Sequence, residues 1–173
     1  RDTVQGLRSS TLETNSLADA LRALAEDLAN ENGHAASAQV EVQGRPQELH
    51  PLVRDETFRI AGEALRNAFC HAAAKHIEVE IRYDARQLLV RVRDDGQGID
   101  PEVLRAGEKQ GHFGLSGMRE RAELVGGTLA VRSSPDAGTE VEFSTPGSQA
   151  YSRHLPTRSW LRHKRSAPSE IGE

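Results

Sequence analysis

The chain has 173 residues, of which 36% are hydrophobic and 28% charged, a composition that fits one globular domain with its own core and irregular ends. No apolar run approaches the roughly 18 to 20 residues needed to cross a bilayer, and the single cysteine, Cys70, excludes both an internal disulfide and a cysteine zinc site. The net charge is −4, and because residues 146–173 carry five Arg or Lys against two Glu, residues 1–145 carry −7. A core this acidic argues against nucleic-acid binding.

The first part of the chain is predicted to hold two helices with a strand between them. After a cap at Asn15-Ser16, leucines recur at helical spacing until Asn32-Gly33 ends the run. Residues 39–43 then alternate as a short strand. A second helix is expected from about residue 51 to 73, beginning at a proline that the first helical turn tolerates.

The second part is predicted to hold two hairpins, separated by a glycine-rich connection and a helix. Strict alternation of polar and apolar residues indicates the strands, and clustered glycines indicate the connection and the breaks. In chain order, these are strands over 76–83 and 87–93, the connection over 96–114, a helix over 115–125, and strands over 128–133 and 139–145.

This order of elements predicts an α+β fold. Antiparallel pairs with interspersed helices are typical of a two-layer α/β sandwich, here a mixed, mostly antiparallel sheet with helices on one face and water on the other. The domain is predicted over residues 15–145. From Pro146 onward the periodicity ends and Ser, Pro and basic residues dominate, so residues 146–173 are expected to form a disordered basic tail.

The clearest chemical signal lies where one strand ends and another begins. Asp94 has the parity of the apolar residues of its strand, so its carboxylate should face the buried side, where it needs a partner. Thr139 shares the parity of Val141 and Phe143, which places an inward hydroxyl at the start of the last strand. Together they indicate an apolar pocket with a polar tip, which suits a flat heterocycle. The alternative is a strand-end aspartate that only caps a turn.

Two clusters of glycines follow Asp94. Gly96 and Gly98 allow the backbone to turn sharply and to approach a ligand closely. The second cluster, residues 111–117, leads directly into a helix, whose N-terminal N–H groups and dipole favour a phosphate chain. The polar stretch between the clusters, residues 99–111, is expected to be a flexible lid. Plain surface loops are the alternative.

A polar stripe runs along the second predicted helix. Glu63, Asn67 and His71 fall at i, i+4 and i+8, on one side of the helix. A carboxylate and a carboxamide one turn apart can hold a hydrated Mg²⁺, which prefers oxygen ligands. A solvated helix face is the alternative. We interpret His71 and His76 as structural, because no further His or Cys stands at zinc spacing.

Four motif-like segments follow one another along the chain: Phe58–Ala72 around Asn67, Asp94–Ile99, Gly111–Ala122 and Gly138–Val141. In spelling and order they resemble the asparagine box and the three glycine boxes of the Bergerat-fold ATPases, which include gyrase, the heat-shock chaperone, mismatch-repair proteins and sensor histidine kinases. The similarity covers about residues 15–145. It is greatest to histidine kinases related to nitrate and cell-envelope sensors, in particular the receptor type with an extracytoplasmic propeller.

The resemblance implies a domain that binds ATP and Mg²⁺ and donates the γ-phosphate to a histidine in two-component signal transduction. Asp94 and Thr139 would bind the adenine, directly or through a shared water, and Asn67 would ligate Mg²⁺. Glu63 and Asn67 are the candidate catalytic residues, with Glu63 in a supporting role near the metal, through water. The backbone around the nucleotide would be shaped by Gly96, Gly98, Ile99, Gly111, His112, Gly114 and Leu115.

The resemblance also predicts what lies around the domain. Residues 1–14 would be the end of a dimerisation helix and a linker, and the chain would be part of the cytoplasmic portion of a longer, membrane-anchored bacterial sensor. Its partners would be the dimerisation and phosphoacceptor helices of the same kinase and a response regulator. We expect the fragment to be monomeric and nearly inactive without the acceptor histidine, and the full-length protein to be a homodimer.

One departure from the family pattern concerns the phosphates. Three residues after Asn67, where related kinases carry Arg or Lys, this chain has Cys70. We therefore predict low nucleotide affinity, unless Lys75, Lys109 or His112 supplies the missing cation. Two other functions stay open: a serine kinase of the anti-sigma-factor type, and a non-catalytic nucleotide-sensing or protein-binding module.

Overall fold

The computed structural model describes residues 16–33, 35–110 and 114–152. Within them five strands form one sheet: β1 (Ser37–Gln43), β2 (His76–Tyr83), β3 (Gln87–Asp94), β4 (Thr128–Ser133) and β5 (Thr139–Pro146). Their order across the sheet is β1-β2-β3-β5-β4. β1 and β2 run parallel, and the other three neighbouring pairs are antiparallel. The predicted mixed, mostly antiparallel sheet is confirmed.

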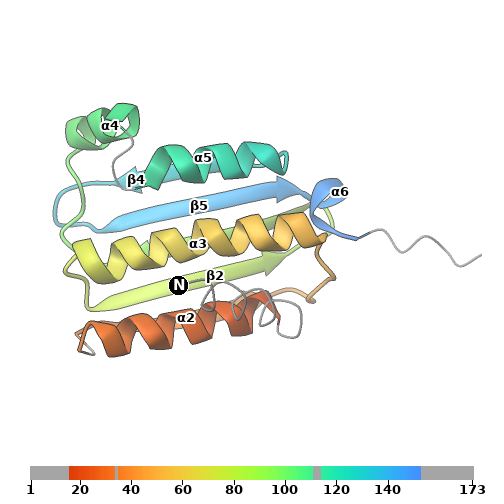
Figure 1. Ribbon diagram of the computed structural model, residues 1–173, viewed down its shortest axis with the longest axis horizontal. Helices are drawn as coiled ribbons and strands as arrows, with labels where there is room; N and C mark the ends of the chain where they lie inside the picture. Colours follow the sequence, from red (N-terminus) through yellow and green to blue (C-terminus); the bar gives the residue numbers. More distant parts are fainter. Residues whose placement is uncertain (1–15, 34, 111–113, 153–173) are drawn as a thin grey trace, which may run out of the picture.

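The described helices are α2 (Leu17–Glu31), α3 (Pro51–His71), α4 (Pro101–Gln110), α5 (Leu115–Leu124) and α6 (Gly147–Ala150). α2, α3 and α5 lie side by side in one layer against the sheet, with α4 at one end of the molecule and α6 at the other (Figure 1). α2 contacts β1, α3 contacts β3 and β5, and α5 contacts β4. The predicted two-layer α+β architecture is therefore correct. No helix among the described residues is both long and apolar enough to span a bilayer.

α3 is the central helix of the layer and carries several candidate site residues. The helix begins at Pro51, and the preceding residue, His50, caps it. The backbone N–H of Leu52 donates to Nδ1 of the His50 ring at 3.3 Å, so a side chain pairs one of the N–H groups that a helix start leaves unpaired. Its buried face combines large and small residues, which lets the helix pack closely on the sheet. These residues are Val53, Ile60, Ala61, Ala64, Leu65 and Ala68.

Residues 101–110 form the helix α4, which corrects the expectation of a loop between the two glycine clusters. The role of a flexible lid expected for residues 99–111 stays a prediction. The side chain of Asp100 accepts the N–H of Glu102 at 2.8 Å, and the Asp100 carbonyl accepts the N–H of Leu104 at 2.8 Å. Aspartate before proline, with a glutamate in the first turn, is a helix start signal. The polar composition of the segment concealed this signal.

Residues 146–152 correct the predicted domain boundary. β5 continues to Pro146, α6 follows, and Tyr151 forms an isolated antiparallel bridge with Leu49. The Tyr151 hydroxyl lies 2.7 Å from the carbonyl oxygen of Asp84, within reach to donate, and Ala150 is fully buried. The expectation of a disordered tail is wrong for these residues. Two apolar side chains, those of Ala150 and Tyr151, pack on the core, and two are too few to produce a recognisable periodicity in the sequence. The remainder of the expected tail, residues 153–173, lies outside the described residues.

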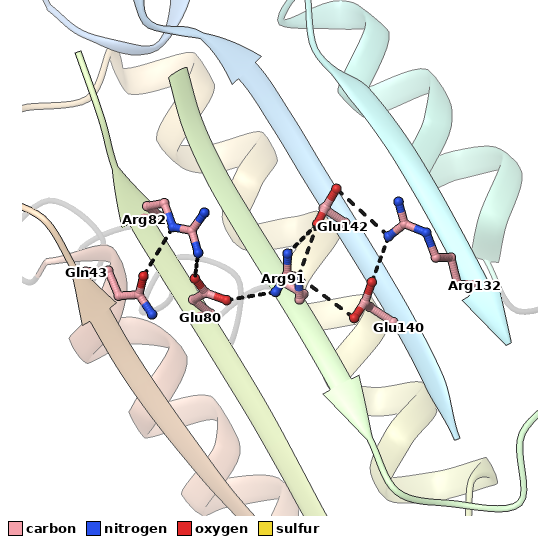
Figure 2. A network of polar contacts seen from close by, with 7 residues as sticks. All are labelled: Gln43, Glu80, Arg82, Arg91, Arg132, Glu140 and Glu142. Atoms are coloured by element: carbon pink, nitrogen blue, oxygen red, sulfur yellow. Dashed lines mark hydrogen bonds and ion pairs between the residues drawn. The ribbon is translucent and has the colours of Figure 1, made fainter. Parts of the chain in front are cut away.

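The sheet face opposite the helices carries a ladder of polar side chains that crosses all five strands (Figure 2). The Arg91 guanidinium on β3 stands at its centre, 2.8 Å from Glu142 on β5 and 3.1 Å from Glu80 on β2. The hydrogen bond to Glu142 raises the pKa of Arg91, against the effect of desolvation. The ladder also includes Gln43, Arg82, Arg132 and Glu140.

We predict that Arg91→Met lowers the free energy of unfolding by about 1 to 2 kcal/mol, because it leaves carboxylates on neighbouring strands without their shared cation. Urea denaturation measures the change. Arg93→Met is the matched control: Arg93 lies on the same strand and face but has no ion pair within the described residues, and its replacement should change the stability by less than about 0.5 kcal/mol. Equal losses in the two variants would contradict the role given to Arg91.

Candidate functional site

A cavity of about 270 Å³ opens between α3, α4, the start of α5 and one end of the sheet. Its walls are mostly apolar, and its polar groups come from different elements. This is the usual composition of a small-molecule site. The lining residues that the argument uses are Asn67, Asp94, Gln97, Gly98, Ile99 and Thr139, with Val92, Leu104, Leu115 and Val141 among the apolar ones.

Asp94 and Thr139 lie together at the sheet end of this cavity, as strand parity predicted. Asp94 is only 6% exposed, and burial raises the pKa of its carboxyl group. The backbone N–H of Gly96, at 2.9 Å, and that of Thr139 donate to the carboxylate and oppose the shift. Because both backbone donors approach one buried carboxylate, Asp94 and Thr139 present adjacent polar atoms to any ligand in the cavity.

Asp95, the next residue, has a different function, although it is also a carboxylate. Its side chain accepts the backbone N–H groups of His76 at 2.9 Å and Lys75 at 2.8 Å, and it lies 2.8 Å from the His76 ring. These hydrogen bonds, led by the backbone N–H of His76, hold the pKa of Asp95 down at about 2. Asp95 therefore ties the end of β3 to the start of β2, and the structural interpretation of His76 agrees with this contact.

The turn after Asp94 is pressed against the backbone on two sides. A Cβ at Gly96 would overlap the carbonyl of Ala72 at the end of α3, and a Cβ at Gly98 would overlap the carbonyl of Ser134 between β4 and β5. Gly98 also has a φ of +66°, which disfavours any other residue. The two glycines are thus required by close approach within the protein, and only Gly98 lines the cavity.

Gln97 is a site residue that the sequence interpretation missed. Its backbone N–H donates to the carbonyl of Ala72 at 2.8 Å, and its side-chain amide donates to the carbonyl of His71 at 2.9 Å. Both carbonyls belong to the end of α3, where helices leave such groups unpaired. Gln97 therefore fixes the turn to α3 and lines the cavity between them. Its position between two glycines was the only sequence signal.

The three residues of the polar stripe predicted on α3 do not all face the cavity. Asn67 and His71 line the cavity, whereas Glu63 does not. The Glu63 carboxylate accepts hydrogen bonds from Arg66 at 3.1 and 3.3 Å. A Cβ at Gly114 would lie 2.8 Å from the Glu63 carboxylate, so Glu63 lies against the turn that starts α5.

The phosphate end predicted from the second glycine cluster is described in part. Gly114 has a φ of +63° and is the N-cap residue of α5, where it has no side chain to cap the first N–H groups of that helix. Leu115, its first residue, lines the cavity. Gly111 and His112 lie outside the described residues, as does the side chain of Lys109.

Cys70 is exposed and does not line the cavity. Lys75 is also exposed, and its backbone rather than its ammonium group makes the contact with Asp95. Within the described residues, no lysine or arginine side chain lines the cavity. That this chain lacks a cation at the phosphate end stays a prediction, because the side chain of Lys109 and the whole of His112 lie outside the described residues.

A mixed sheet covered by helices on one face, with a buried aspartate, glycine turns and a helix N-terminus around one cavity, defines the Bergerat type of ATPase domain. Residues 52–149, more than half of the chain, match the family model described as "Histidine kinase-, DNA gyrase B-, and HSP90-like ATPase". The chain belongs to this family. Its relatives, described next, identify it as the ATPase domain of a sensor histidine kinase.

Among curated relatives, the histidine-protein kinase/phosphatase DegS of Brevibacillus brevis is 35% identical over 103 residues, 60% of this chain and 26% of that protein. The sensor histidine kinase LiaS of Bacillus subtilis is 31% identical over 140 residues, 81% of this chain and 37% of that protein. The solved histidine kinase domain of the Erythrobacter litoralis EL346 blue-light activated kinase superposes with a TM-score of 0.60 at 27% identity, covering 77% of this chain and 62% of that one. The chain thus spans well under half the length of these curated relatives.

Proposed function

We propose that this domain binds ATP together with Mg²⁺ and donates the γ-phosphate to a histidine of a phosphoacceptor domain in the same kinase. The observation that carries the proposal is that one cavity brings together Asn67, Asp94 and Thr139 from three separate elements. The apolar walls suit the adenine, and the buried Asp94 carboxylate suits its 6-amino group. These three residues are among those to which the family resemblance assigned roles at the nucleotide and the metal.

The chain's own residues fit a magnesium ion only in part. Asn67 offers a carboxamide oxygen in the cavity, whereas Glu63 is bound by Arg66 and lies against Gly114. Mg²⁺ commonly takes one or two protein oxygens and completes its shell with water and substrate phosphates. We therefore assign Asn67 to the metal, which would neutralise phosphate charge when bound, and we assign Glu63 to the support of the α5 turn.

The N-terminus of α5 is the proposed site of the phosphate chain. The N-cap residue, Gly114, supplies no side-chain cap to the first N–H groups of the helix, and the helix dipole favours negative charge. Leu115 brings this end to the cavity, and Asn67 lines the neighbouring wall. A nucleotide with its adenine at Asp94 would then direct its phosphates toward the α3 and α5 side of the cavity.

The wider function follows from the relatives and is part of the proposal. The sensor kinases that this chain resembles are much longer, so the acceptor histidine and the sensing parts would lie outside it. The partners would be the dimerisation and phosphoacceptor helices of the same, homodimeric kinase and a response regulator, in the cytoplasmic portion of a sensor. Transfer requires the acceptor in line with the γ-phosphate, so the domain alone should have little activity.

The first test concerns binding. Calorimetric titration with ATP should give a Kd at least about tenfold higher for Asp94→Asn, because the amide replaces an acceptor oxygen with a donor at the adenine edge. Asn67→Ala should weaken binding in the presence of Mg²⁺ and have little effect with EDTA. Asp95→Asn is the matched control and should stay within about twofold of the original Kd, since Asp95 points to β2. Unchanged binding in both site variants would refute the assignment.

The second test concerns Cys70. Cys70→Arg should lower the Kd for Mg²⁺·ATP by about three- to tenfold, because it restores a cation three residues after Asn67. Cys70→Met, which adds length without charge, is the control and should leave the Kd unchanged. An affinity that is the same in all three proteins would show that no phosphate cation is missing.

The third test concerns phosphoryl transfer. With Mg²⁺·ATP alone, we expect the domain to show almost no phosphorylation, whereas addition of the phosphoacceptor domain of its own kinase should give an acid-labile phosphohistidine on that domain. An acid-stable phosphoprotein would favour the serine-kinase alternative. ATP binding with no transfer under either condition would favour a nucleotide-sensing module.

A further inference from the structure

Ser133, the last residue of β4, forms a hydrogen-bonded junction behind the polar end of the cavity. Its hydroxyl oxygen accepts the backbone N–H of Ile99 at 2.8 Å. The same oxygen lies 3.0 Å from the carbonyl of Gly138 and 2.8 Å from the hydroxyl of Thr139. Ser133 does not line the cavity, whereas Thr139 and Ile99 do. Ser133 therefore contacts the ligand site only through its neighbours.

The directions of these hydrogen bonds follow from counting hydrogens. A serine hydroxyl has one hydrogen to donate and two lone pairs. The Ile99 N–H can only donate, so it takes one lone pair, and the Gly138 carbonyl can only accept, so it takes the hydrogen. The remaining lone pair of Ser133 then accepts the hydrogen of Thr139. All four groups are satisfied by this arrangement, whereas the reverse direction would leave the Gly138 carbonyl without its donor.

This direction fixes what Thr139 offers to a ligand. With its only hydrogen given to Ser133, the Thr139 oxygen presents lone pairs alone to the cavity. The neighbouring Asp94 carboxylate is likewise an acceptor, and it lines the same cavity. The side chains at this end therefore act as acceptors only, and an exocyclic group placed against them must be a donor. An amino group meets this requirement, whereas an oxo group in the same place is repelled.

We propose that Ser133 is a positioning residue for base selection: by holding the Thr139 hydroxyl as an acceptor, it makes the site prefer 6-aminopurine over 6-oxopurine nucleotides. This inference rests on the proposed binding of a nucleoside triphosphate in the cavity. Asp94 alone would provide only part of the preference for 6-aminopurines. Ser133, which does not contact the ligand, would provide another part through Thr139.

The test compares ATP with inosine triphosphate, which has an oxo group in place of the 6-amino group and a proton on N1. Calorimetric titration of the original chain should give a lower Kd for ATP. In Ser133→Ala the released Thr139 hydroxyl can rotate and donate to the oxo group, so the ratio of the two Kd values should fall by about tenfold, the factor that one ordinary hydrogen bond contributes. Ser133→Thr keeps the hydroxyl and should retain the original ratio.

The same measurement distinguishes a purely structural role of Ser133 from the proposed role in base selection. Loss of the contact to Ile99 would weaken both nucleotides alike and leave the ratio unchanged. Ser134→Ala, the same change at the exposed neighbouring residue, is the control and should alter neither Kd nor ratio. Thr139→Val should lower the ratio, and Ser133→Ala in that background should lower it no further, because Ser133 acts through the threonine.

The outcomes are distinguishable. If the original chain binds neither nucleotide, the proposed function fails. If it binds ATP but Ser133→Ala leaves the ratio unchanged or raises it, the role of Ser133 is refuted while ATP binding stands. Should Ser133→Ala not fold, as judged by its thermal unfolding, Thr139→Val decides: a ratio equal to that of the original chain refutes the proposal, and a lowered ratio supports it.

Discussion

The close contact of the Asp94–Gly98 turn with its neighbours is the constraint on which the site depends. Three carbonyl groups, those of Ala72, Ser134 and Asp94, occupy the space where a Cβ would stand at Gly96, Gly98 and Gly138. The absence of these side chains brings the end of α3, the end of β3 and the β4–β5 turn into backbone contact, which hydrogen bonds from Gln97 then fix. The cavity is what remains between elements that cannot come closer.

The same packing gives two adjacent carboxylates opposite properties. Asp94 faces inward, where burial raises its pKa, and Asp95 faces outward, where the N–H groups at the start of β2 hold its pKa at about 2. Asp94, the last residue of β3, has the parity of the buried residues of the strand, whereas Asp95 follows the strand, is exposed and accepts the N–H groups of Lys75 and His76. A ligand carboxylate and a structural carboxylate can therefore stand side by side without sharing one environment.

Sequence reasoning located the five strands and predicted that Asp94 and Thr139 share one cavity, because both follow from periodicity. Parity placed Asp94 inside and Thr139 beside it, and alternation gave all five strands. Sequence reasoning failed where contacts between distant parts of the chain determine the structure. The polar composition of α4 concealed a helix, and residues 146–152 carry too few apolar side chains for a pattern. The hydrogen bonds of Gln97 and Ser133 reach elements that are far away in the chain. Glu63 lies on the predicted helix but does not line the cavity. Its carboxylate accepts hydrogen bonds from Arg66, and the role expected for it near the metal stays a prediction.

The two ends of the cavity differ in how far the chain completes them. At the end of the cavity near Asp94, the backbone N–H of Gly96 donates to the Asp94 carboxylate, and the Ser133 hydroxyl lies within hydrogen-bond distance of the Gly138 carbonyl and the Thr139 hydroxyl. Contacts within the protein therefore position these side chains. At the phosphate end, the described residues contribute a helix N-terminus and Asn67 but no cationic side chain. In the proposed function, the charge of the phosphates would be balanced largely by magnesium and by groups outside the described residues. Under the proposed function, the nucleotide would be selected by its base, and the phosphate end would be completed by the phosphoacceptor partner.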